Sequence, residues 1–174
     1  MMFSKNRRGF SLVEILIVLG LMGVLATVVL MNFSGSDTGT KEQTLKANLS
    51  ALRQALDLYR SDHGWYPCTA GDWNAAGNSN NFINQMTQYT SATGQPSTTK
   101  STTYKYGPYL KAFPKEPFSG LTTTTINTTN ERLLSAIATA VAASAATGGW
   151  YYESKSGNIC GNLGTTFPSS YAGY

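Results

Sequence analysis

The ionisable residue in the most unusual setting is Glu14, which is the only charged residue between Phe10 and Met31 in an otherwise apolar stretch. A lone carboxylate is costly to bury in hydrocarbon, so it is usually functional or paired with a cation. The stretch contains no cation, and a partner must therefore come from outside it. The alternative is a protonated Glu14 that stays unpaired near a membrane interface.

Residues for catalysis or metal binding are few. The single histidine is His63, and its place beside Gly64 and Trp65 is more typical of a surface or helix-capping residue than of a ligand. No cysteine and histidine cluster has the spacing of a zinc site. No nucleophile-elbow motif accompanies His63. The sequence therefore predicts that the protein is not an enzyme.

The charge distribution argues against a nucleic-acid partner. Three of the 13 basic residues precede position 9, which leaves 10 basic and 9 acidic residues in the rest of the chain. A nucleic-acid interface needs a clustered basic face. We therefore expect no nucleic-acid binding.

The apolar stretch approaches the length of a helix that spans a bilayer, about 20 residues. Basic residues precede it, so its amino end should stay in the cytoplasm and the remainder should lie outside. A secretory signal cut near Ala26 is the alternative. It leaves Glu14 without a use, and the apolar run continues past Ala26 to Met31.

The motif GFSLVE, Gly9 to Glu14, resembles the cleavage motif of type IV pilins and type II secretion pseudopilins, which carry a class III signal peptide. The resemblance implies that residues 1–9 are a leader. A prepilin peptidase would cut between Gly9 and Phe10 and methylate the new amine of Phe10. That amine would supply the missing cation for Glu14 of a neighbouring subunit, and the pair would set the register of assembly.

The helix should extend beyond the apolar stretch. After a polar segment at 32–39, apolar residues return at helical spacing, and Gly64 and Pro67 mark the end. The residues of this stripe are Leu45, Leu49, Leu52, Leu56 and Tyr59. The sequence thus predicts a helix with a transmembrane or filament-core half, 10–33, and an amphipathic half, 34–62.

The remaining residues, 63–174, should form a globular head. We expect a short helix at 82–89, an edge strand or exposed loop at 121–129, an alanine-rich helix at 131–146 and a hairpin at 148–162. The segments GPYL, PKEP and GWYY are similar to segments of pseudopilin heads. The resemblance, closest to the major pseudopilin type, implies an α+β lollipop in which one long amino-terminal helix packs on a small antiparallel sheet.

The two cysteines, Cys68 and Cys160, both follow the apolar stretch. On the exported side of a membrane an even count fits one disulfide, and two buried free thiols are the alternative. A Cys68–Cys160 bond would close a large loop and stabilise the head by roughly 4–5 kcal/mol. It would fasten the head to the end of the helix.

No cofactor is expected. Major pseudopilins bind calcium through aspartates in a carboxyl-terminal loop, but the tail of this chain has no acidic residue. Asn158 and Asn162 could supply oxygen ligands, so calcium stays an alternative. Asn127 begins a glycosylation sequon, although an exposed polar loop is the simpler interpretation.

The expected function is that of a structural subunit of a periplasmic or extracellular filament. The subunit would wait in a bacterial inner membrane with its head outside, and then form a homopolymer through its amino-terminal helix. Its partners would be the prepilin peptidase, an inner-membrane assembly platform and minor subunits. Two alternatives remain: a type IV pilus pilin for adhesion, motility or DNA uptake, and a membrane-anchored binding domain that never polymerises.

Overall fold

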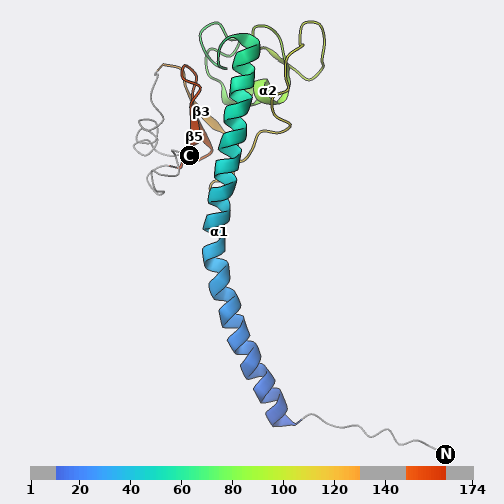
Figure 1. Ribbon diagram of the computed structural model, residues 1–174, viewed down its shortest axis with the longest axis vertical. Coiled ribbons are helices and arrows are strands. Elements are labelled where there is room, and N and C mark those ends of the chain that lie inside the picture. Colours follow the sequence, from blue (N-terminus) through green and yellow to red (C-terminus); the bar gives the residue numbers. More distant parts are fainter. Residues whose placement is uncertain (1–10, 130–147, 164–174) are drawn as a thin grey trace, which may run out of the picture. The chain divides into compact units, whose positions relative to one another are not determined.

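The computed structural model describes residues 11–129 and 148–163 (Figure 1). The chain divides into two compact units, Met1–Thr40 and Lys41–Tyr174. The helix α1, Leu12–His63, is continuous between them. It stays helical through the polar segment 32–39, so the predicted long helix is confirmed and the polar residues do not interrupt it.

The helix α1 ends where the sequence predicts. Gly64 adopts a positive φ of 83°, and its N–H donates to the carbonyl of Arg60 at 2.8 Å. Glycine is the residue that most easily takes this left-handed conformation after a helix. The chain therefore turns away from α1 directly after His63.

One sheet of the head has the strand order β3-β4-β5, with β3 at Thr124–Asn127, β4 at Trp150–Glu153 and β5 at Ile159–Gly161. The strands β4 and β5 form the predicted antiparallel hairpin. The strand β3 confirms the predicted edge strand. It pairs with β4 in parallel, so the small sheet that the sequence predicts as antiparallel is mixed. A parallel pair needs a crossover of a dozen or more residues, and the connection from Asn127 to Trp150 is long enough.

The second part of the head holds α2, Ser79–Thr87, and a short antiparallel pair, β1 at Tyr89–Thr90 and β2 at Pro96–Ser97. The predicted short helix is confirmed, but it begins three residues early. The side chain of Asn78 caps it by accepting from the N–H of Asn81 at 3.1 Å. The predicted alanine-rich helix at 131–146 lies outside the described residues.

The core forms where the leucine stripe of α1 meets the sheet and α2. The stripe residues are all essentially inaccessible to solvent. They pack with apolar side chains of α2, β4 and β5, namely Phe82, Met86, Trp150, Tyr152 and Ile159. The prediction that this stripe packs a core is therefore confirmed.

Candidate functional site

The first part of α1 exposes an apolar surface on all sides. Every large apolar side chain between Leu12 and Leu25 is at least 43% exposed. Because successive helical residues point about 100° apart, these side chains surround the whole helix. A helix that is apolar all round is stable only in lipid or among other apolar surfaces. Within the described ranges, no helix has the combined length and apolar character of a candidate membrane span.

Glu14 lies in the first turn of α1 with its side chain exposed. The unsatisfied N–H groups and the dipole at a helix amino terminus favour an acidic residue in this place. The predicted cleavage site, Gly9 and Phe10, lies outside the described residues. The pairing of Glu14 with the Phe10 amine therefore stays a prediction.

Cys68 and Cys160 are both buried and both free, so the predicted disulfide is not confirmed. The strand register gives the reason. Cys160 lies opposite Tyr151 and shares its face, whereas Ile159 and Tyr152 point to the other face. Cys68 belongs to the core cluster that contains Ile159 and Tyr152. The two thiols therefore lie on opposite faces of the sheet.

Neither thiol has the surroundings of a reactive cysteine. Burial raises the pKa of Cys160 to about 12, despite the opposing effect of the nearby Arg53. Burial also raises the pKa of Cys68, and the negative charge of Asp72 adds to this effect. Because the thiolate is the nucleophile and the metal ligand, the raised pKa values disfavour reaction and metal binding at neutral pH.

A buried polar cluster, which the sequence did not indicate, joins the end of α1 to the loop after it and to α2. Its centre is Asp72, which accepts from the Tyr59 hydroxyl at 2.7 Å and from the N–H of Cys68 at 2.9 Å. The N–H of Asn74 donates to Asp72 at 3.1 Å. The amide of Gln85 donates to both carboxylate oxygens. Hydrogen-bond donors, rather than a cation, thus stabilise this buried carboxylate.

His63 is buried rather than on the surface, and its contact with the carbonyl of Tyr59 in the last turn of α1 fits the other part of the expectation, a helix-capping residue. Its ring stacks on Tyr59 with centroids 4.0 Å apart. Nδ1 lies 3.0 Å from the carbonyl oxygen of Tyr59, and Nε2 lies 3.0 Å from that of Ser91. The tyrosines that enclose the ring, Tyr106 and Tyr109, come from a remote segment, which is why the local sequence did not indicate burial.

The two asparagines considered for calcium do not converge. Asn158 and Asn162 flank opposite ends of β5. The side chain of Asn162 is buried, and its amide donates to the hydroxyl of Thr125 at 3.2 Å. Among the described residues, no group of three His, Cys, Asp or Glu side chains could hold a metal ion.

Asn127, the first residue of the sequon, lies in β3 and is only partly exposed, so the prediction of an exposed loop is wrong here. Its amide donates to the Tyr151 hydroxyl at 3.0 Å. The side-chain oxygen Oδ1 of Asn127 accepts from the N–H of Thr129 at 2.9 Å. Both polar atoms of the side chain are therefore engaged within the head.

The described features define a class of protein. An apolar helix that needs an external partner, a single acidic residue in its first turn and a small α+β head are together typical of a prepilin-like subunit. The family model "Prokaryotic N-terminal methylation motif" matches residues 4–30, which contain the predicted cleavage site.

The relatives agree with this class. The type II secretion system core protein G of Aeromonas hydrophila is 29% identical over 117 residues, which cover 67% of this chain and 71% of that protein. The protein of the same name from Vibrio cholerae serotype O1 is 27% identical over 114 residues, 66% of this chain and 67% of that protein. The protein of the same name from Klebsiella pneumoniae is 40% identical over 65 residues, which cover 37% of this chain and 46% of that protein. No solved structure matches the chain significantly. The motif match and these relatives support the expected resemblance to the pilin and pseudopilin family.

Proposed function

We propose that this protein is a structural subunit of a type II secretion pseudopilus or a related filament. The subunit is anchored in the inner membrane by the amino-terminal part of its helix, with its head outside the cytoplasm. It then leaves the bilayer and polymerises through the same part of the helix. It catalyses no reaction and is itself the substrate of a prepilin peptidase.

The observation that carries the proposal is the apolar surface around the start of α1. A stripe on one face would be covered by a single partner surface, but an apolar surface on all sides requires surroundings on all sides. Lipid provides these before assembly. Copies of the same helix, gathered around the axis of a filament, provide them afterwards.

Glu14 fits this proposal because processing creates its partner. Cleavage after Gly9 and methylation leave a cationic amine on Phe10. In the filament, the amine of each new subunit neutralises Glu14 of its neighbour. A buried ion pair contributes little net stability but specifies register well, which is what the addition of subunits requires.

The processing step can be tested by the intact mass of the mature protein. We expect the loss of nine residues, Met1 to Gly9, and the gain of one methyl group. Retention of the leader would contradict the proposal and favour a membrane-anchored domain that does not polymerise.

The assembly step can be tested with the substitution Glu14→Ala in the full chain. We expect filaments to be lost while processing continues, because the substitution leaves the cleavage site intact. Glu42→Ala is the matched control, since Glu42 pairs with Lys46 on the surface of α1 at 3.1 Å and should be dispensable for assembly. A normal filament yield for Glu14→Ala, measured by electron microscopy, would overturn the proposed pairing.

A further inference from the structure

The last turns of α1 carry two hollows of opposite charge. The first, here called the acidic groove, has a volume of about 260 Å³ and contains one acidic side chain and no cation. It is lined by Leu58, Asp62, Gly107, Pro108 and Tyr109. Leu58 is 57% exposed, the largest exposed fraction among the large apolar side chains described beyond residue 40. Its exposure beside a charged group suggests a surface that meets a partner.

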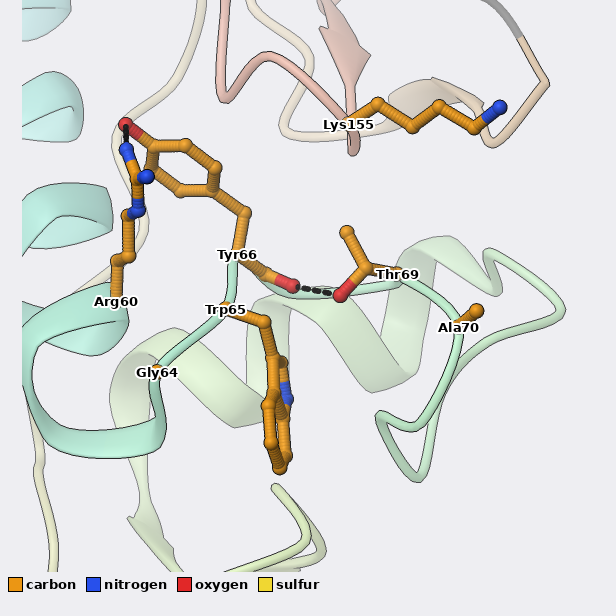
Figure 2. Close-up of a pocket in the computed structure, with 7 residues that line it drawn as sticks. All are labelled: Arg60, Gly64, Trp65, Tyr66, Thr69, Ala70 and Lys155. Carbon is orange, nitrogen blue, oxygen red and sulfur yellow. Dashed lines mark hydrogen bonds between the residues drawn. The ribbon is translucent and has the colours of Figure 1, made fainter.

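The second hollow, here called the cationic pocket, is shown in Figure 2 and has a volume of about 410 Å³. Figure 2 shows Arg60 of α1 at one end of it and Lys155, which follows β4, at the other, with the Lys155 amine pointing away from Tyr66. Among the described residues no acidic side chain lines it. Aromatic and small residues form the rest of its wall. The full lining is Arg60, Gly64, Trp65, Tyr66, Thr69, Ala70 and Lys155.

Helix geometry places the two hollows on different sides of α1. Leu58 and Asp62 are four residues apart and share one face. Arg60 is two residues from each of them, and two helical residues correspond to a rotation of about 200°. The acidic groove and the cationic pocket therefore face nearly opposite directions across the same turns of the helix.

The direct hydrogen-bond partners of the charges in both hollows are neutral, and the Tyr66 hydroxyl that accepts from Arg60 also donates to the carboxylate of Asp57 at 3.1 Å. Asp62 accepts from the Tyr109 hydroxyl at 3.0 Å. Lys155 donates to the carbonyl of Thr129 at 2.8 Å, and Arg60 donates to the Tyr66 hydroxyl at 3.3 Å. In the described part of the chain, none of these three charged groups takes part in an ion pair. Each hollow therefore presents a charge that a partner could neutralise.

We propose that the acidic groove of one copy of this chain binds the cationic pocket of the next copy. Asp62 of one subunit then meets Lys155 and Arg60 of its neighbour, and Leu58 is covered by the aromatic wall of that pocket. The inference rests on the proposed function, because it assumes that copies of the chain are brought side by side in a filament.

The arrangement of the two hollows favours a filament over a closed dimer. When two different surfaces of one molecule are complementary, each added copy leaves one surface open at each end, and the assembly propagates. Charge complementarity also rejects wrong registers, because a shifted subunit would place like charges together. The heads thereby add a second determinant of register to the amino-terminal helix.

The contact can be tested by zero-length carbodiimide crosslinking, which joins a carboxylate to an amine that it touches. In filaments of the full chain, we expect a crosslinked peptide pair that contains Asp62 and Lys155. Filaments of Asp62→Asn alone and of Lys155→Gln alone should lack it. In cells that co-express the two variants the pair should reappear, because the intact Asp62 and the intact Lys155 then belong to different copies.

A charge exchange tests the same contact by yield. Asp62→Lys should lower the filament yield about tenfold, because it places like charges together. The double variant Asp62→Lys/Lys155→Asp should restore most of the yield. Lys100→Asp is the matched control, since Lys100 is also an exposed lysine of the head and lines neither hollow.

The outcomes separate this inference from the proposed function. If the unmodified chain forms no filaments, the proposed function fails. If filaments form but the crosslinked pair is absent, or the pair does not reappear on co-expression, only the contact between heads is wrong. A crosslink from Asp62 or Lys155 to a different protein would also overturn the inference, because it would identify another occupant.

Discussion

Two regions of α1 share one secondary structure and differ completely in burial. Leu45, Leu49 and Leu52 are fully buried in the head, whereas the apolar side chains between Leu12 and Leu25 are at least 43% exposed. In the second region apolar residues recur every three or four positions, so one surface of the head covers them all. In the first region apolar residues occupy nearly every position, and no single surface can cover all of them. The spacing of apolar residues thus determines whether a helix packs within its own chain or among partners.

The largest expected effect tests this comparison with two matched leucine-to-alanine substitutions, one in each region of α1. Leu49→Ala should lower the free energy of unfolding of the head by about 2–5 kcal/mol, because it removes buried methyl groups and leaves a cavity. Leu16→Ala should change that free energy by no more than about 0.5 kcal/mol, because Leu16 is exposed. Urea unfolding of the full chain in detergent, followed by tryptophan fluorescence, measures both.

The same two variants should exchange rank when filament assembly is measured. Leu16→Ala should weaken assembly, since it removes part of the surface that copies share. Equal losses of head stability for the two substitutions would show that the two regions of α1 do not differ in the way proposed.

The sequence predicts best the features that depend on neighbours along the chain. The leucine stripe indicates the buried face of α1, Gly64 its end, and the tyrosines after Trp150 the hairpin. Features that join distant segments were missed. The parallel pairing of β3 depends on the path of a long connection, and the burial of Asp72 depends on donors at positions 59 and 85. For the same reason, spacing alone could not show that the two cysteines lie on opposite faces of the sheet.

A smaller effect is expected at the polar cluster that fixes the end of the amphipathic region. Asp72→Asn replaces one acceptor oxygen with an amide that faces other donors, such as the Tyr59 hydroxyl and the amide of Gln85. The head should lose about 1–3 kcal/mol of stability, the cost of a buried polar group without its partner. Asp57→Asn is the matched control. Asp57 is an exposed acidic residue of the same helix that, in the described part of the chain, accepts from the Tyr66 hydroxyl at 3.1 Å. Its substitution should cost about 0.5 kcal/mol or less.

If Asp72→Asn leaves assembly per folded subunit unchanged, the polar cluster stabilises the head and takes no part in contacts between subunits. Equal destabilisation by the two asparagine variants would contradict the role given to Asp72. Urea unfolding at one pH measures the stability of both variants, and the filament yield per folded subunit measures assembly.

The smallest expected effect is a pH dependence of stability above pH 9, and it involves Cys160. Burial raises the pKa of this thiol from its ordinary value of 9.0 to about 12. Below pH 9 the thiol is protonated in both the folded and the unfolded chain, and its contribution to stability is complete. Between pH 9 and about 12 the unfolded chain loses this proton while the folded chain keeps it, so stability falls as the pH rises.

Cys160→Ala should remove this contribution to the pH dependence, because alanine does not titrate. The difference in unfolding free energy between the unmodified chain and the variant should therefore shrink from pH 8 to pH 10, while the other titrating groups of the head affect both equally. The measurement is urea unfolding at each pH, with a maleimide probe to confirm that the native thiol is unreactive. Parallel pH profiles would mean that Cys160 is accessible to solvent or oxidised in the folded protein. The apolar residues from Leu16 to Leu25 include no titratable side chain. Any pH dependence of stability that Cys160→Ala removes therefore belongs to the head. There, burial within the chain, rather than among partners, controls the pKa of the thiol.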